Sequence, residues 1–429
     1  MALAVAAGAI AGVIVAGPAS AQVDWQKYKG QEINVLLNNH PWTQALRDLS
    51  KEFTAKTGIN VKMDVFGEEQ FRARLTTVMQ AKTGDLDGYM SLTIREGFVF
   101  DKAGWYQDLK PFIENKALTE ANWNYEDFGA GLRSAHTING KVVTIPINSE
   151  GPLFYWRKDI FEKCKVPEPK FLEDIPEAAK ALKACDANQG VWAARGLRPQ
   201  IPYGMAAFVN NMGGSFTTSE GKPGLCQEKT LAGLGMYASL LKDYGPIGAA
   251  NHGFPQVIEL LGQGRVAMVH ESSNEFSNIM KFPGRDKDLG VKPLPPGKAS
   301  GVSKPVTIGW GVAMSPYSTK KEATWLFWQW VTSAEIQGRL VDNGVAPPRS
   351  SVFNGEAFKK WSSELPIRQA WADALVEIGK TGTGMYQTNT PRIPESRELI
   401  GRAIQEALLG QKSIKDAACA ADADLAKLE

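Results

Sequence analysis

The chain has 429 residues, of which 43% are hydrophobic and 22% charged, so it is long enough for two or three hydrophobic cores and is not intrinsically disordered. Its formal net charge is only +2, and Lys and Arg form no dense run. A nucleic-acid-binding protein usually carries a basic patch, so we expect no nucleic-acid partner.

The N-terminus has the pattern of a secretion signal. Residues 2–17 are apolar and uncharged, and they are followed by Ala19-Ser20-Ala21, a small-residue cleavage motif. We therefore expect residues 1–21 to be removed as a signal peptide and the mature protein to work in the periplasm. A membrane anchor is the alternative, since no Lys or Arg precedes the apolar run.

The first third of the mature chain alternates strand and helix patterns. An apolar strand over 33–37 leads into an amphipathic helix that begins at Pro41, and Gly58 is placed to end that helix. Strands over 59–65 and 86–91 follow, with a second helix between them. This β-α-β-α-β order predicts a parallel sheet, with ligands beyond the carboxyl ends of its strands.

Residues 140–161 look like a crossing between two bodies. A β-type run over 142–147 breaks at 148–152 and resumes as a second apolar run that enters a helix. Pro146 and Pro152 restrict the backbone on either side, and Gly151 permits unusual backbone angles. We therefore expect a directed connection rather than a flexible linker.

The rest of the chain continues with helices and short strands. We expect helices over 159–165, 174–185, 231–241 and 321–331, and a strand over 265–269 followed by a polar loop. The Pro- and Gly-rich residues 290–301 and residues 344–351 have the composition of connections. Trp325, Trp328 and Trp330 fall on one predicted helix and are expected to pack in the core.

Four cysteines would meet an oxidising compartment after export, where they allow three pairings. Cys164 and Cys185 flank one predicted helix, so we expect them to form a disulfide. For Cys226 and Cys419, both a second disulfide and two unpaired thiols remain open.

Several short motifs resemble the extracytoplasmic solute-binding proteins of the sugar-binding family that includes the maltose-binding protein. Thr57-Gly58-Ile59 and the terminal helix pair around 407–417 resemble stretches of that family. The crossing carries the most specific match, which comprises Gly140, Lys141, Pro146, Glu150, Tyr155, Lys158 and Asp159.

The resemblance implies an α/β fold of two lobes, the type II periplasmic binding protein fold. Each lobe would be a mainly parallel sheet flanked by helices. The first lobe would contain residues 22–147 and 297–345, and the second lobe 148–296 and 346–429. Three crossings, at 147–151, 293–297 and 346–351, would join them around a ligand cleft.

A cleft for sugars or polyols needs an aromatic face for the C–H side of the ligand and fixed polar groups for its hydroxyls. Trp310 between Gly309 and Gly311 suits the first need, because flanking glycines would leave room for a ligand, although a core tryptophan is the alternative. The candidate ligand-binding residues are Asn39, His40, Trp42, Glu68, Asn148, Glu150, Asn211, Glu271, Trp310 and Arg349. For each polar residue in this set, the alternative is that its side chain lies on the solvent-exposed surface and binds no ligand.

The resemblance implies the substrate-binding protein of an ABC importer, a monomer that carries a sugar or polyol to a membrane permease. The sequence has no zinc, P-loop or nucleophile-elbow motif, so we expect no metal, no cofactor and no catalytic step. Two alternatives stay open. Abundant Asp and Glu allow a secreted carbohydrate-active enzyme, and Arg349 allows a same-fold binder of a charged solute such as a phosphate ester, glycerophosphodiester or polyamine.

Overall fold

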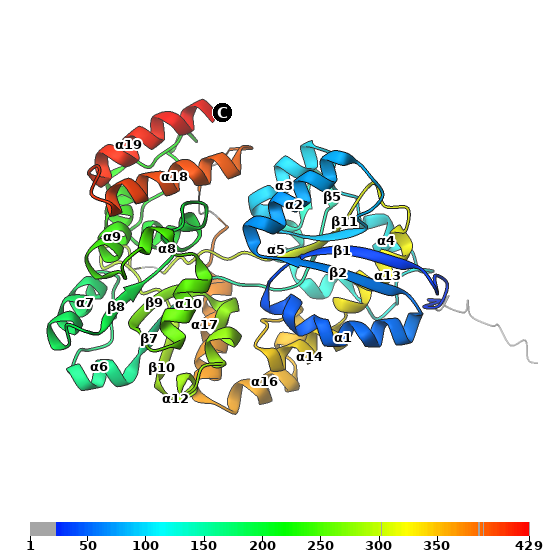
Figure 1. Ribbon diagram of the computed structural model, residues 1–429, viewed down its shortest axis with the longest axis horizontal. Helices are drawn as coiled ribbons and strands as arrows, with labels where there is room; N and C mark the ends of the chain where they lie inside the picture. The colour runs from blue at the N-terminus through cyan, green and yellow to red at the C-terminus, as the bar shows by residue number, and fades with distance from the viewer. Residues whose placement is uncertain (1–22, 302, 385–386, 389, 429) are drawn as a thin grey trace, which may run out of the picture.

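The computed structural model describes residues 23–428 except 302, 385–386 and 389, so the predicted signal peptide lies outside the described residues. Figure 1 shows two α/β lobes side by side. The first lobe contains β1 Glu32–Asn38, α1 Pro41–Thr57, β2 Asn60–Phe66, α2 Glu68–Ala81, β3 Gly88–Ser91, α3 Thr93–Lys102, α4 Lys110–Glu114, α5 Ala130–Ala135, β4 Thr137–Ile138, β5 Lys141–Val142, β6 Ile145–Pro146, β11 Gly311–Met314 and α13 Lys321–Val331.

The second lobe is built mainly from the middle and the end of the chain. It contains β7 Pro152–Arg157, α6 Lys158–Cys164, α7 Asp174–Cys185, β8 Gly190–Ala193, α8 Ile201–Asn211, α9 Glu228–Tyr244, α10 Phe254–Gly262, β9 Val266–Ser272, the short 3-10 helix η4 Ser273–Glu275, α11 Phe276–Met280, α12 Arg285–Asp288, β10 Leu289–Pro293, α17 Pro366–Thr381, α18 Ile393–Leu408 and α19 Ile414–Leu425. In the lower part of Figure 1, α14 Ala334–Leu340 and α16 Glu356–Ser363 lie between α12 of the second lobe and α1 of the first, and α15 Ser350–Phe353 lies between them in the chain.

The β-α-β-α-β unit predicted at the N-terminus is confirmed. His40 caps α1, with its Nδ1 accepting a hydrogen bond from the Trp42 backbone N–H, and Pro41 occupies the first turn, where its missing N–H costs nothing. Gly58 ends the helix with φ of 71°, in the left-handed region that glycine adopts without strain. Local sequence signals therefore determine where α1 begins and where it ends.

Both sheets are mixed rather than mainly parallel. The first has the strand order β2-β1-β3-β11-β6, in which β1 runs parallel to β2 and β3, whereas β11 runs antiparallel to both neighbours. The second has the order β10-β7-β9-β8, with only the β8–β9 pair parallel. Every antiparallel pair in these two sheets involves β7 or β11. Each of these two strands enters its sheet directly from a crossing.

Two of the crossings run side by side as an antiparallel pair. Glu150 and Ile308 exchange backbone hydrogen bonds of 2.8 and 2.9 Å. Gly151 has no unusual backbone angle, contrary to the prediction. A Cβ at this position would lie 2.3 Å from the Val306 carbonyl oxygen, so the close approach of the two strands requires the glycine.

The second crossing lies further along the chain than the predicted 293–297. Residues 290–293, predicted as part of a connection, belong to the edge strand β10, where Pro293 can be tolerated because an edge has one unpaired side. Asn211 then holds the following segment on the second lobe by binding the carbonyls of Leu294 and Pro295 and the N–H of Lys304. The full division of the chain between the lobes stays a prediction.

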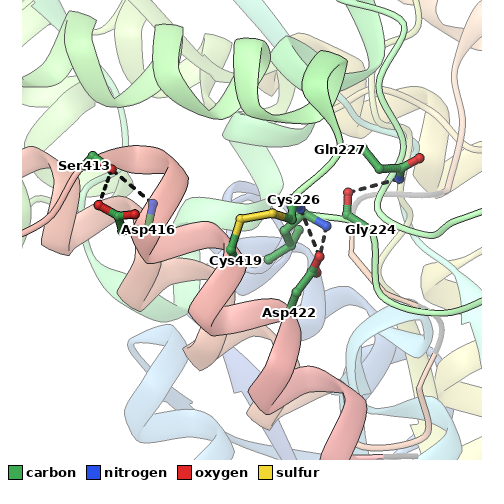
Figure 2. The surroundings of a disulfide bond; sticks show 8 residues. Gly224, Cys226, Gln227, Ser413, Asp416, Cys419 and Asp422 are labelled. Carbon is green, nitrogen blue, oxygen red and sulfur yellow. Dashed lines mark hydrogen bonds between the residues drawn. A yellow bond between two sulfur atoms is a disulfide. The ribbon is translucent and has the colours of Figure 1, made fainter.

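The structure contains two disulfides. Cys164 is joined to Cys185 across α6 and α7, which is the pair that the sequence predicts. Cys226 is joined to Cys419 on α19, and Figure 2 shows Asp422 beside this bond. The Asp422 carboxylate accepts hydrogen bonds from the backbone N–H groups of Leu225 and Cys226 at 2.7 and 2.9 Å. The last helix is therefore attached to the second lobe both covalently and by a charged acceptor.

The described part of the chain has no helix with the length and apolar character of a membrane span. Within the same residues, no group of three or more His, Cys, Asp or Glu side chains is arranged to hold a metal ion.

Candidate functional site

A cavity of about 50 Å³ lies between the lobes, next to the paired crossings. It borders a larger cleft of about 740 Å³, and the two share Asn39, Glu68, Phe254 and Glu275. The side chains around the smaller cavity come from strand ends, helix starts and crossings of both lobes. They are Asn38, Asn39, His40, Glu68, Leu92, Glu150, Arg195, Tyr203, Phe254, Ser272, Asn274, Glu275, Ile308, Trp310 and Arg397.

The aromatic side chains of the cavity wall are Trp310, Tyr203 and Phe254, and Trp310 is 4% exposed. The centroid of the Trp310 ring lies 6.0 Å from the centroid of the His40 ring. It lies 5.3 Å from Cζ of the Arg72 guanidinium. Gly309 and Gly311 serve the protein rather than a ligand, contrary to the sequence interpretation. A Cβ on either would lie within 3.1 Å of the buried His136 ring, so the glycines let the chain pack there.

Asn148 and His40 connect the lobes at the base of the cavity. Asn148 does not line the cavity, but its Oδ1 accepts a hydrogen bond from the Trp310 backbone N–H at 2.9 Å and so positions the ring. The side-chain amide of Asn274, from the second lobe, lies 2.9 Å from Nε2 of His40 in the first lobe. Burial lowers the pKa of His40 to about 3, although the Glu68 carboxylate opposes this shift. The imidazole is therefore neutral where the lobes meet.

Glu68 is charged and well compensated. Burial alone would raise its pKa, but Arg72, Arg95 and Arg195 together hold it at about 2. Its Oε1 accepts hydrogen bonds from Arg72 at 2.6 Å and from Arg95 at 3.1 Å. The first lobe thus presents a fixed carboxylate acceptor to the cavity.

Arg195 brings a positive charge to the opposite wall, and Glu271 neutralises it. Nε of Arg195 donates to both Glu271 oxygens at 3.0 Å, and a second guanidinium nitrogen makes a shorter contact. The guanidinium also lies 4.8 Å from the centre of the Tyr203 ring. The predicted ligand residue Glu271 is therefore a partner of Arg195, behind the cavity wall.

Two other carboxyl groups face the cavity with raised pKa values. Burial raises the pKa of Glu150 to about 7, and the Ser272 hydroxyl and Arg195 offset part of this effect. Burial likewise raises the pKa of Glu275 to about 7, partly offset by a hydrogen bond from Asn278. These groups stand near the midpoint of protonation at neutral pH.

Five of the predicted ligand-binding residues line the cavity, namely Asn39, His40, Glu68, Glu150 and Trp310. Asn148 and Glu271 support it from behind. Three lie elsewhere. Trp42 is fully buried on α1, and Asn211 fastens residues 294–304, while the buried Arg349 donates to the carbonyls of Thr332 and Asn124 and pairs with Asp127.

The sequence interpretation missed Arg195, Asn274 and Glu275. Arg195 follows β8, a strand of four residues whose pattern is too short to be recognised in the sequence, although a strand end was the available signal. The sequence predicted a polar loop after residue 269, and Glu271 was the candidate ligand residue from that loop. Because β9 extends to Ser272, neighbouring side chains alternate between faces, and Ser272 rather than Glu271 faces the cavity.

Comparison with known proteins places this arrangement in a family. The erythritol/L-threitol-binding protein of Mycolicibacterium smegmatis is 28% identical over 80% of this chain and 75% of that protein. The mannitol-binding protein of Pseudomonas aeruginosa is 24% identical over 91% of each chain. A solute-binding protein of Agrobacterium radiobacter, solved in complex with ribitol, superposes with a TM-score of 0.81 at 24% identity, over 94% of this chain and 99% of that one.

The family model described as bacterial extracellular solute-binding protein matches residues 39–338, well over half of the chain. That segment contains every strand of the two lobe sheets except β1, together with the paired crossings and nearly all of the cavity wall. The chain belongs to the bacterial extracellular solute-binding proteins.

Proposed function

We propose that this protein captures an uncharged polyol or a small sugar between its lobes and delivers it to the membrane permease of an ABC importer. The observation that carries the proposal is the composition of the cavity wall. Trp310 supplies an apolar face, and amide, hydroxyl and carboxyl groups from both lobes supply hydrogen-bonding partners for hydroxyl groups. Relatives named for erythritol, threitol and mannitol binding support the same class of ligand.

The charges in the cavity disfavour an anionic ligand. Glu68, Glu150 and Glu275 face it. Of the two cations among its described lining residues, Arg195 pairs with Glu271, and Arg397 donates to the Pro199 carbonyl. Arg349, which left an anionic ligand open at the sequence level, is buried outside the cavity. A phosphate ester would therefore add negative charge beside carboxyl groups.

The protein is expected to bind without turnover, as a periplasmic monomer whose lobes close on the ligand. Ligand contacts from both lobes favour the closed form over the open one, and this difference in affinity is what shifts the population. The direct contact between His40 and Asn274 supports this mechanism, because it can form only when the lobes meet.

A ligand screen tests the proposal. Thermal shift and calorimetry should be run with erythritol, ribitol, mannitol and maltose, and in parallel with sn-glycerol 3-phosphate and spermidine. A ligand present at ~100 Kd stabilises the folded state by about 2.7 kcal/mol, which is well within detection. Stabilisation by an uncharged compound, recovered unchanged, is expected. A response only to the phosphate ester or the polyamine would refute the proposed ligand class.

Replacing Trp310 with alanine should weaken binding of the best polyol by about 30- to 100-fold, or ~2–3 kcal/mol, because the ring's apolar face would be lost. Calorimetric titration measures this loss. Trp42→Ala is the matched control, since Trp42 is fully buried away from the cavity. The control should lower the free energy of unfolding by about 3–5 kcal/mol and leave the affinity of the folded protein close to that of the wild type. Wild-type affinity in Trp310→Ala would contradict the role given to this ring.

A further inference from the structure

Glu150 and Glu275 are buried carboxyl groups without a cationic partner. They are 4% and 6% exposed, and both line the cavity. Glu150 accepts a short hydrogen bond from the Ser272 hydroxyl, and Glu275 accepts one from the Asn278 amide at 2.7 Å. In the described part of the chain, no Lys, Arg or His nitrogen lies within ion-pair distance of either carboxyl. Neither group is therefore compensated as Glu68 is.

The cations around the cavity are already engaged. Arg72 and Arg95 pair with Glu68, and Arg195 pairs with Glu271. Arg397, from α18, donates to the carbonyl oxygen of Pro199 at 2.6 and 2.9 Å. A charge on Glu150 or Glu275 is therefore stabilised by neutral donors, by the longer-range attraction of Arg195 and by the ligand, but by no direct ion pair.

Burying a carboxylate without a partner costs several kcal/mol, and a buried group usually avoids this cost by holding a proton. Burial raises the pKa of Glu150 and of Glu275 to about 7, in line with that expectation. In the open form, where the cleft contains water, both should return to the ordinary glutamate value of about 4.3. Closing the lobes near neutral pH should therefore draw protons from solution.

We propose that Glu150 and Glu275 together hold at least one proton when the ligand is enclosed, and that this carboxyl pair limits the cavity to uncharged ligands. A protonated carboxyl donates a hydrogen bond, and a carboxylate accepts one. The pair thus offers both roles to hydroxyl groups, which also donate and accept. In an aldonate, a terminal CH₂OH of the polyol is replaced by a carboxylate. That carboxylate would add a negative charge beside the Glu150 and Glu275 carboxyls and, unlike the hydroxyl it replaces, has no proton to donate. The inference rests on the proposed function, since it concerns the same cavity.

Closing the lobes should remove a proton from His40, whereas it adds protons to Glu150 and Glu275. His40 faces this group of side chains from the start of α1, with Glu68 beside it, and burial holds its pKa at about 3. In the open form its pKa should be about 6.5, so closing the lobes releases a proton from His40 below that pH. The other charged and titratable groups around the two carboxyls are Glu271, Tyr155, Tyr203, Arg195 and Arg397. Two carboxyls that gain protons and one imidazole that loses one leave a net uptake of about one proton near pH 6.

The sign of the pH dependence follows from this balance. A carboxyl whose pKa rises on closing favours the closed form at low pH, and this advantage is lost as the pH rises through about 7. Polyol affinity should therefore fall as the pH rises from 6 to 8, by at most tenfold per pH unit for each proton taken up. A cationic ligand would not cause this uptake, because both carboxylates would stay ionised on closing, as they are in the open form, and only the proton release from His40 would remain.

The test is calorimetry of the whole mature protein with whichever of erythritol, ribitol and mannitol binds most tightly. Titrations at pH 6 in buffers with different ionisation enthalpies give the number of protons exchanged. We expect uptake of about one proton in the wild type. Glu150→Gln and Glu275→Gln together should abolish uptake and leave the proton release from His40. His40→Asn keeps a helix-capping side chain and should increase uptake. Glu52→Gln, on the exposed face of α1, should leave the proton count unchanged.

A second arm compares the chosen polyol with its matched aldonate, such as ribitol with ribonate. The wild type should bind the aldonate at least about 100-fold more weakly, because the ligand charge would lie beside carboxyl groups without a cation. The variant with both Glu150→Gln and Glu275→Gln should show a smaller difference between its affinities for the polyol and for the aldonate. Polyol binding with no proton uptake, or equal affinity for polyol and aldonate, would overturn the inference while leaving the proposed function intact. Failure of all three polyols to bind would instead refute the proposed function. Both wild-type measurements remain decisive if a variant does not fold.

Discussion

Replacing both Cys226 and Cys419 with serine should lower the free energy of unfolding by about 5 kcal/mol, since the disulfide links residues separated by 193 positions. In the chain-entropy description, a cross-link over such a distance removes many conformations from the unfolded chain. The disulfide also attaches α19 to the segment before α9, where Asp422 binds two backbone N–H groups (Figure 2). Denaturant unfolding followed by circular dichroism measures the loss.

The matched control is the double serine variant of Cys164 and Cys185. These residues are separated by only 21 positions, so the same description gives a smaller loss of about 3 kcal/mol. The long-range disulfide should therefore contribute more than the local one. Equal losses in the two variants, or a larger loss for the local pair, would contradict this account.

Arg195→Met should lower the free energy of unfolding by about 3–5 kcal/mol, because it would leave the Glu271 carboxylate buried without its cation. The Glu271 side chain is 0% exposed, and among the described residues only the Ser272 backbone N–H, at 2.7 Å, would remain as a donor. Methionine keeps the length of the side chain, so the loss should report the missing charge rather than a cavity. Polyol affinity should also fall, since Arg195 lines the cavity.

Arg339→Met provides the comparison for Arg195→Met. Arg339 makes a two-point pair with Glu52 at 2.7 Å for each contact, but both side chains are largely exposed. Water already stabilises these charges, so this variant should lose far less stability. A loss in Arg195→Met no greater than that in Arg339→Met would show that the buried pair has no special role.

Features with local causes could be predicted from the sequence. The helix α1 starts and stops where Pro41 and Gly58 indicate, because capping and backbone restriction act within a few residues. The first crossing could be recognised in the same way, since strand patterns flank a break between two prolines. Asn39, His40 and Glu68 then followed as site residues, because carboxyl ends of parallel strands meet at one edge of a sheet.

Features that depend on the packing of distant segments could not be predicted. Arg349 was placed in the predicted third crossing as a ligand residue, yet Asp127 and two carbonyls from the first lobe bind its guanidinium away from the cleft. The choice between Glu271 and Ser272 depends on the exact end of β9, and a shift of one residue reverses which side chain faces the cavity. The direction of β7 and β11 depends on how the crossings enter the sheets, which no local pattern reports.

Small-angle X-ray scattering tests most directly the central claim that two lobes close on an uncharged ligand and release it unchanged. The wild-type protein should be measured alone and with a saturating amount of the polyol that binds most tightly. We predict a decrease in the radius of gyration, with the polyol recovered intact, because ligand contacts from both lobes form only in the closed form. An unchanged radius of gyration at saturation, together with conversion of the ligand to a product, would contradict the account and favour an enzyme.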